Sequence, residues 1–233
     1  MIKISSEYLL LFDIDGTLIK RCRAHNKAFG AAIEAVYGKP ADIRDLRPHG
    51  KTDPWLVMEA LQLNGMPEEN ILPRLEACLR RMEDYFIRFI SPDETEAFEG
   101  VKRLLEVLHK KQYLLGLVTG NLEKIAFAKL ESAGLGGFFQ IGGFGSDDMD
   151  RTRLVEIAIG RAIEKLGFGG ERSKVFLFGD TPNDIYAGRE AGVMTVGVAT
   201  SIFSPGDLSG AGADYVLESL SHAGTVEGIL TGP

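Results

Sequence analysis

Cysteine and histidine are scarce in this sequence: its 233 residues include two cysteines, Cys22 and Cys78, and four scattered histidines. The cysteines lie far apart and form no CxxC pair, which argues against both a disulfide framework and a structural zinc site. The motifs HExxH, GxSxG and GxGxxG are also absent, so zinc peptidases, serine hydrolases and dinucleotide enzymes have no support. We therefore expect a reduced, cytoplasmic protein whose chemistry depends on other side chains.

Long hydrophobic runs and excess positive charge are missing as well. The apolar run before the first aspartate, residues 8–12, is too short for a secretory signal, and no stretch approaches the roughly 18 apolar residues of a membrane span. The formal net charge is −7, so the chain gains no general attraction to nucleic acid or to an anionic membrane. We expect a small-molecule partner, and an anionic one would need a local positive site such as a metal ion. The sequence carries no signature of the oligomeric state.

Short apolar segments rich in β-formers recur along the chain, at residues 8–12, 113–118, 174–178, 193–198 and 214–217. Helical periodicity separates the later ones, with apolar residues repeating at steps of three and four in 101–108 and 154–166. Strands that read as continuous apolar runs are buried on both faces, and helices between them indicate parallel crossovers. The sequence therefore predicts an α/β fold with a Rossmann-like, doubly wound parallel sheet.

Residues 20–91 interrupt this alternation, because the segment contains helical patterns and no convincing strand. The pair Asp53-Pro54 resembles a helix N-cap followed by proline at the first helical position. Further on, an apolar stripe extends over nearly five turns, formed by Leu72, Leu75, Leu79, Met82, Phe86 and Phe89. We expect a helical cap domain at 20–91, inserted into an α/β core made of residues 1–19 and 92–233.

The strongest chemical signal is LFDIDGT at residues 11–17, directly after the first apolar run. Open α/β sheets bind ligands beyond the carboxyl ends of their strands, so Asp13 and Asp15 are delivered to the expected position of a site. Gly16 allows the backbone to bend sharply behind them, and we expect it to contact the substrate. The competing interpretation is an Asx-type turn in which the aspartates satisfy backbone N–H groups.

A second apolar strand ends in acids, in VFLFGDTPND at residues 175–184. Together with the first pair, Asp180 and Asp184 would form a carboxylate cluster that requires a cation. Oxygen ligands without cysteine or histidine favour Mg²⁺ over zinc or copper, which makes Asp13, Asp15, Asp180 and Asp184 the candidate ligands. For Asp184 a plain helix-capping role is an alternative, since a helix begins just after Pro182.

Two further segments add polar groups. In LVTGN at residues 117–121, Thr119, Gly120 and Asn121 follow a strand and can offer a hydroxyl and N–H groups to a phosphate, although such residues also cap helices. Arg151 and Arg153 precede a helical pattern, and a cation there can hold a transferring phosphoryl group. Either arginine alone fits a solvated surface equally well.

The order DIDGT, LVTGN, a basic residue before a helix, and FGDTPND resembles the haloacid dehalogenase superfamily over essentially the whole chain. It is most similar to the phosphatases of that superfamily with a helical cap, of the phosphoglycolate phosphatase type. The resemblance implies a magnesium-dependent phosphatase that acts on a small phosphate ester through an aspartyl-phosphate. In such enzymes the basic residue is usually lysine, so an arginine is a departure. A DRxxL pattern favours Arg151, whereas the distance to the helix end favours Arg153.

By resemblance, Asp13 is the nucleophile, Asp15 the general acid and base, and Thr119 a phosphoryl ligand. Asp180, Asp13 and the Asp15 carbonyl would hold Mg²⁺, with Asp184 in support. Because an acid must carry a proton near neutral pH, we expect the surroundings of Asp15 to favour its neutral form. Lys51, in the segment GKTD, matches a cap loop that faces the catalytic aspartates, and either touches the substrate or is a surface lysine.

The sequence bears differently on three alternatives to a phosphatase. A dehalogenase is disfavoured, because those relatives lack a second aspartate of the Asp15 kind. A sugar-phosphate mutase would use the same core residues and stays open. A non-catalytic binding protein on the same scaffold would have no need to keep Asp13, Asp15, Thr119 and Asp180.

Overall fold

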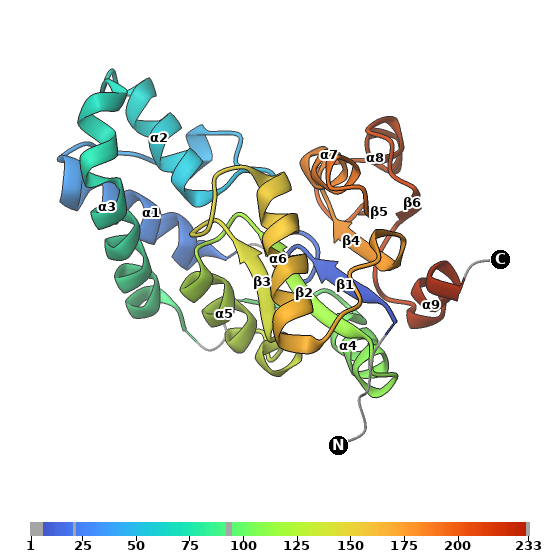
Figure 1. The fold of residues 1–233 in the computed structure, drawn as a ribbon. Helices are drawn as coiled ribbons and strands as arrows, with labels where there is room; N and C mark the ends of the chain where they lie inside the picture. The colour runs from blue at the N-terminus through green and yellow to red at the C-terminus, as the bar shows by residue number, and fades with distance from the viewer. Residues whose placement is uncertain (1–6, 21, 92–94, 232–233) are drawn as a thin grey trace.

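The computed structural model describes residues 7–20, 22–91 and 95–231, and it shows a parallel sheet flanked by helices, with a helical group at one end (Figure 1). Within these residues the sheet consists of β1 (Leu9–Phe12), β2 (Leu114–Thr119), β3 (Ile141–Phe144), β4 (Val175–Gly179), β5 (Met194–Val198) and β6 (Tyr215–Leu217). Their order is β3-β2-β1-β4-β5-β6, and all the pairings are parallel. The predicted α/β fold with a parallel sheet is confirmed.

Strand β1 is buried on both faces, which explains its unbroken apolar sequence. Leu10 and Phe12 belong to the layer packed by α4 (Val101–Lys110), α5 (Glu123–Ser132) and α9 (Ala223–Thr231). Leu9 and Leu11 face the other layer, packed by α6 (Arg151–Leu166) and α7 (Pro182–Glu190). The short helix α8 (Pro205–Gly210) packs beside β5 and β6. Two helical layers therefore fix the strand that carries the first acidic motif.

Strand β3 was not among the predicted strands, because two of its four residues are glycine. Both glycines are required by close packing. A Cβ on Gly143 would lie 1.9 Å from the carbonyl oxygen of Leu154 in α6, and one on Gly142 would lie 2.9 Å from the Cβ of Leu117 in β2. The glycines remove the apolar pattern by which a strand is found in sequence, and in the structure they let α6 approach the sheet.

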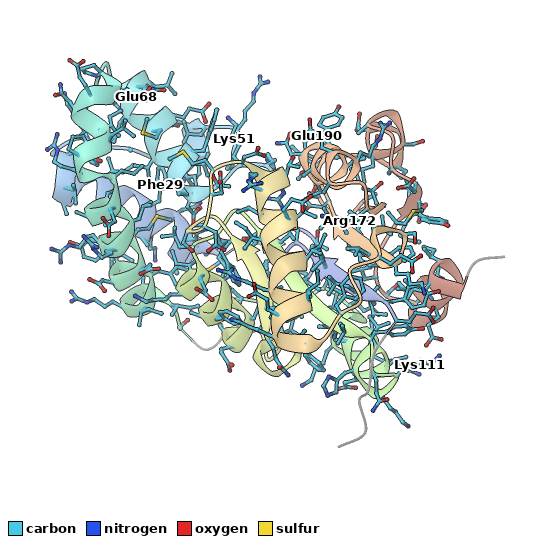
Figure 2. The ribbon with its side chains drawn as sticks, in the orientation of Figure 1. Phe29, Lys51, Glu68, Lys111, Arg172 and Glu190 are labelled. Carbon is cyan, nitrogen blue, oxygen red and sulfur yellow. The ribbon has the colours of Figure 1, made fainter. Side chains whose placement is uncertain are left out.

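The segment between β1 and α4 forms the cap, built from α1 (Arg23–Tyr37), a 3-10 turn (Ile43–Asp45), α2 (Asp53–Leu63) and α3 (Glu68–Phe89). Figure 2 shows Phe29 inside this group of helices and Lys51 on the connection that leads to α2. The apolar interior of the cap also includes Leu122, the N-cap of α5, and Ile125 within α5, so cap and core share one packed surface. We retain 20–91 as the proposed extent of the cap. Pro92, at its proposed end, lies outside the described residues.

The structure corrects two details of the cap. Asp53 is the first residue of α2 and Thr52 is its N-cap, so Asp53 does not cap the helix as predicted. The buried stripe of α3 consists of Ile71, Leu75, Cys78, Met82 and Phe86, whereas Leu72 and Phe89 of the predicted stripe are exposed. The stripe that packs inside the cap begins at Ile71, one residue before the predicted start at Leu72. No helix in the described part of the chain is long and apolar enough to cross a membrane.

Candidate active site

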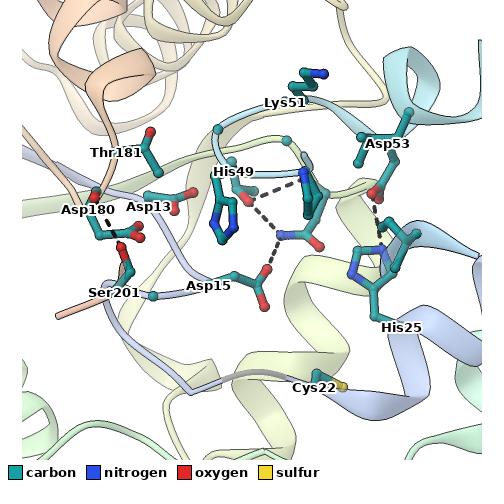
Figure 3. Close-up of a pocket in the computed structure, with 18 of the residues that line it drawn as sticks. Asp13, Asp15, Cys22, His25, His49, Lys51, Asp53, Asp180, Thr181 and Ser201 are labelled. Carbon is teal, nitrogen blue, oxygen red and sulfur yellow. Dashed lines mark hydrogen bonds and ion pairs between the residues drawn. The ribbon is translucent and has the colours of Figure 1, made fainter. Parts of the chain in front are cut away.

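The candidate site lies where the order of the strands reverses, at the carboxyl ends of β1, β2 and β4. Asp13 follows β1, Asp180 follows β4 and Thr119 ends β2, and β1 pairs with both neighbours. Figure 3 shows Asp13, Asp15 and Asp180 around one part of a pocket, with His25 and Asp53 toward the cap. The pocket has a volume of about 870 Å³ and is lined by both cap and core. This is the position at which open α/β sheets bind ligands.

Three buried carboxylates meet here, because Asp13, Asp180 and Asp184 each offer an oxygen within 4.8 Å of the others. Burial raises the pKa of Asp13 well above its ordinary value; Arg151 opposes the rise, and Asp184 and Asp180 add to it. Burial and the charge of Asp184 raise the pKa of Asp180 to about 6, against the hydrogen bonds from Ser201 and Thr17. The cluster thus carries more negative charge than its own cation neutralises, which suits a bound divalent ion.

Gly16 is required by the approach of the two acidic segments. Its φ is +93°, and a Cβ there would lie 2.4 Å from Oδ2 of Asp180. Its N–H donates to the carbonyl of Ile19 at 2.9 Å, so this N–H is already used and is not free for the substrate. The hydroxyl of the next residue, Thr17, donates to Oδ1 of Asp180 at 3.1 Å. The turn therefore fixes Asp180 against β1.

Arg151 is the cation of the cluster. Its Nη2 lies 2.8 Å from Oδ1 of Asp13 and 2.5 Å from Oδ1 of Asp184, and its side chain is 8% exposed. It is the first residue of α6, whose N-cap Asp150 accepts a hydrogen bond from Thr152 N–H. Arg153, two residues further along α6, is exposed and does not line the pocket. The structure thus brings Arg151, and not Arg153, into the acidic cluster.

Asp184 combines the capping role with a contact in the cluster. Its Oδ2 accepts hydrogen bonds from the N–H and the hydroxyl of Thr181, at 3.0 and 2.7 Å, which forms the capping box of α7. Its Oδ1 accepts from Nε and Nη2 of Arg151. A carboxylate has about four lone-pair sites, and all of them are used here. Asp13 and Asp180 therefore remain the carboxylates best able to hold Mg²⁺ directly, and their hard oxygen atoms suit that ion.

The polar corner after β2 is directed toward Asp15. The side-chain amide of Asn121 donates to Oδ2 of Asp15 and to the hydroxyl oxygen of Thr119, both at 2.7 Å. The backbone N–H of Asn121 also donates to the Thr119 oxygen, at 3.3 Å. Both acceptor positions of the Thr119 hydroxyl are then filled, which leaves its O–H to donate to a ligand. Gly120 lines the pocket between them.

Lys129 of α5 is a site residue that the sequence did not indicate. Its Nζ donates to both oxygens of Asp15, at 2.8 and 2.6 Å, and its side chain is fully buried. Burial alone would raise the pKa of Asp15, but the charge of Lys129 and the hydrogen bonds from Lys129 and Asn121 outweigh it and lower that pKa. The expectation that the surroundings favour neutral Asp15 is therefore wrong for this structure.

The cap contributes a loop that rests on the core. Asp53 N–H donates to the carbonyl of Gly120 at 2.8 Å, and the Asp53 carboxylate accepts from Leu122 N–H at 3.0 Å. From the other side, Asn183 donates to the carbonyl of His49 at 3.1 Å. Lys51 lines the pocket, with its ammonium 2.7 Å from Glu59 of α2. The GKTD segment is thus a contact between cap and core.

Comparison with known proteins agrees with this geometry. Residues 10–198 match the family model described as haloacid dehalogenase-like hydrolase. A pyrophosphatase PpaX from Listeria welshimeri is 28% identical over 91% of this chain and 92% of its own. A phosphoglycolate phosphatase from Vibrio parahaemolyticus is 27% identical over 92% of this chain and 93% of its own.

Solved structures share the fold. A hydrolase from Pseudomonas syringae superposes with a TM-score of 0.69 at 22% identity, covering 96% of this chain and 99% of its own. A predicted phosphoglycolate phosphatase from Haemophilus somnus gives the same TM-score at 18% identity, with coverage of 96% and 99%. The family model spans both acidic motifs and most of the chain. The chain is therefore a member of the haloacid dehalogenase-like hydrolase family.

Proposed function

We propose that this chain is a magnesium-dependent phosphatase that hydrolyses a small-molecule phosphate ester by way of a phosphoryl group on Asp13. The observation that carries the proposal is the contact of Arg151 with Asp13 inside a buried carboxylate cluster at the carboxyl end of β1. The names of the curated relatives, pyrophosphatase and phosphoglycolate phosphatase, support hydrolysis over transfer to sugar.

Asp13 and Asp180 would hold the ion, together with the backbone carbonyl of Asp15 by family resemblance, while Asp184 orients Arg151. When bound, Mg²⁺ would neutralise charge on the phosphoryl oxygens. The fit rests on the buried cluster, in which oxygens of Asp13, Asp180 and Asp184 lie within 4.8 Å of one another beside the guanidinium of Arg151.

In the first step a carboxylate oxygen of Asp13 attacks phosphorus, and the bond from phosphorus to the leaving oxygen breaks. Asp15 donates a proton to that oxygen, so the alcohol departs neutral. The Thr119 hydroxyl donates to a phosphoryl oxygen, and the charge of Arg151 stabilises the negative charge that builds up there. All four of these residues line the pocket.

In the second step water attacks the phosphorus of the aspartyl-phosphate and gives a proton to Asp15. The bond from phosphorus to the Asp13 oxygen breaks, and its electron pair restores the Asp13 carboxylate. Inorganic phosphate leaves, and Asp15 is again protonated for the next cycle. Because its pKa is lowered, Asp15 is held as a carboxylate, the form that can accept a proton in this step.

The pocket suggests an ester with a second negative group. Its volume is within the range that holds small-molecule ligands, and its lining includes Lys20, Arg23 and Arg44 on the cap side. Lys20 is paired with Glu96, and Arg44 with Asp42, whereas the side chain of Arg23 has no hydrogen bond or ion pair with a described residue. Phosphoglycolate, which carries a carboxylate beside its phosphate, is our first candidate substrate.

A phosphate-release screen tests the proposal. Phosphoglycolate, pyrophosphate, p-nitrophenyl phosphate and a hexose phosphate are incubated with the protein, with and without Mg²⁺, beside Asp13→Asn. We expect Mg²⁺-dependent release that Asp13→Asn abolishes. Release that survives this substitution would overturn the role of Asp13, and an isomerised hexose phosphate without free phosphate would identify a mutase. No release from any ester would favour the non-catalytic binding protein.

A further inference from the structure

The ammonium of Lys129 has a complete set of partners inside the protein. Its side chain is fully buried. Its Nζ lies 2.6 and 2.8 Å from the two oxygens of Asp15, 2.7 Å from Oδ1 of Asn121 and 3.0 Å from Nδ1 of His25. A lysine ammonium has three N–H donors and no acceptor, so each partner residue receives one donor.

These contacts determine which groups in the network donate a hydrogen bond and which accept one. Because Lys129 can only donate, Nδ1 of His25 accepts and its proton resides on Nε2. That Nε2 lies 3.1 Å from Oδ1 of Asp53, the residue that also accepts from Leu122 N–H. The contact with His25 therefore helps to fix the position of the Lys129 ammonium before any substrate binds.

The hydrogen bonds leave one side of Asp15 open. Its Oδ2 accepts from Lys129 and from Asn121, which fills both lone-pair positions of that oxygen. Its Oδ1 accepts from Lys129 alone, and the Asp15 side chain is 34% exposed and lines the pocket. Oδ1 is thus the oxygen that remains available to a ligand.

We propose that Lys129 is a positioning residue for Asp15: it holds the carboxylate so that Oδ1 faces the phosphate ester and exchanges the proton. The inference rests on the proposed function. Lys129 is not among the residues that line the pocket, so it acts through Asp15 and not on the ester itself.

The free-energy cost of burying a charged side chain supports a functional reason for Lys129. A buried ion pair is often replaced by apolar side chains without loss of stability, whereas an isolated buried charge is expensive. The other buried residues of α5 are apolar, namely Ile125 and Ala126 on the same face as Lys129, and Leu130 next to it. An apolar residue would therefore extend the packed surface, and the lysine contributes orientation of Asp15 instead.

The test compares two esters in one variant. The leaving group of p-nitrophenyl phosphate departs without a proton, whereas an alkyl ester such as phosphoglycolate needs one from Asp15. The ratio kcat/KM reports the steps up to formation of the phosphorylated enzyme. We expect Lys129→Met to lower kcat/KM for phosphoglycolate by about 10²-fold, the order of loss that accompanies a misplaced catalytic group. The value for p-nitrophenyl phosphate should change much less.

Asp15→Asn gives the reference pattern, and Lys129→Met should reproduce it in weaker form. The matched control is Lys124→Met on the same helix, because Lys124 is 70% exposed and pairs with Glu83; it should leave both esters unaffected. Equal loss on both esters, or no loss, would overturn the inference. Thermal unfolding is recorded for each variant, and Lys129→Gln, which keeps a neutral donor, replaces Lys129→Met if the latter does not fold. A wild-type protein that releases no phosphate would contradict the proposed function instead.

Discussion

Arg151 Nη2 lies 2.8 Å from Oδ1 of Asp13, and the same nitrogen contacts Asp184. One guanidinium at the start of α6 therefore links the acidic residue after β1 to the one at the start of α7. Arginine suits this position because its planar fork can donate to two carboxylates at once, which a lysine ammonium does less well. The departure from the lysine usual in similar enzymes thus has a local explanation in this cluster.

Replacing Arg151 by Gln should impair both activity and stability. The loss of a preorganised cation next to the phosphoryl position costs about 10²–10³-fold in kcat. Removing one partner of a buried ion pair costs about 3–5 kcal/mol in the free energy of unfolding. Arg153→Gln is the control, because Arg153 is exposed, and should stay within about 0.5 kcal/mol of wild type. If the two variants lost the same activity, Arg151 would have no special role.

The stability of the metal-free protein should depend on pH through Asp180. Its pKa is raised from 3.8 to about 6, so the folded state binds this proton more tightly than the unfolded state. Asp180 therefore destabilises the fold increasingly as pH rises from about 4 to 6, and the penalty is complete above that range. In EDTA at pH 7, Asp180→Asn should be more stable than wild type, with a smaller difference at pH 4.5. Urea unfolding of both proteins at the two pH values measures this.

Added Mg²⁺ provides the counterpart of that measurement. An ion that binds the folded state alone stabilises it in proportion to the logarithm of its concentration. Wild type at pH 7 should gain stability with Mg²⁺, whereas Asp180→Asn should gain little. A wild-type protein that is indifferent to Mg²⁺ would argue against the metal site.

The acidic motifs could be located from sequence because of a property of parallel sheets. Their strands end at the same edge, so acids that follow separate apolar runs, such as Asp13 and Asp180, meet in space. The charge state of Asp15 could not be predicted in this way. It depends on Lys129, which lies 114 residues further along the chain. A lysine in an amphipathic helix is normally on the solvent side, so nothing in the pattern marked this one as buried.

Substituting a glycine of β3 tests whether the close packing of α6 on this strand requires glycine. Gly143→Ala would place a Cβ 1.9 Å from the Leu154 carbonyl oxygen, so α6 must move away from the sheet. We expect a loss of about 1–3 kcal/mol in the free energy of unfolding, as for other overpacked sites. Gly160→Ala, in α6 itself with no atom within 4 Å of the new Cβ, should stabilise by about 0.5–1 kcal/mol. Urea unfolding measures the free energy of unfolding of each variant, and similar effects of the two substitutions would refute the packing argument.

Arg23 should distinguish esters by their second charge. It lines the pocket without an ion pair to any described residue, so Arg23→Gln should raise KM for 3-phosphoglycerate more than for glycerol 3-phosphate. The two esters differ in a carboxylate, and loss of one charge-assisted hydrogen bond costs about 1.5–3 kcal/mol, or about 10–100-fold in KM. Arg153→Gln again serves as the control. An equal rise for both esters would mean that Arg23 does not read the second charge.

Gly120 should control how the cap loop rests on the core. A Cβ there would lie 2.1 Å from the carbonyl oxygen of Lys51, and the other close atoms are also in the cap loop, so Gly120→Ala would displace that loop and leave the sheet intact. A displacement of about 1 Å can cost about 10²-fold in rate, and we expect a loss of that order in kcat/KM. The single tryptophan, Trp55, is near the start of α2 and its fluorescence should change with the loop. Gly137→Ala, where no atom lies within 4 Å of the new Cβ, should alter neither signal. Wild-type kinetics with a shifted Trp55 spectrum would show that the loop moves without affecting catalysis.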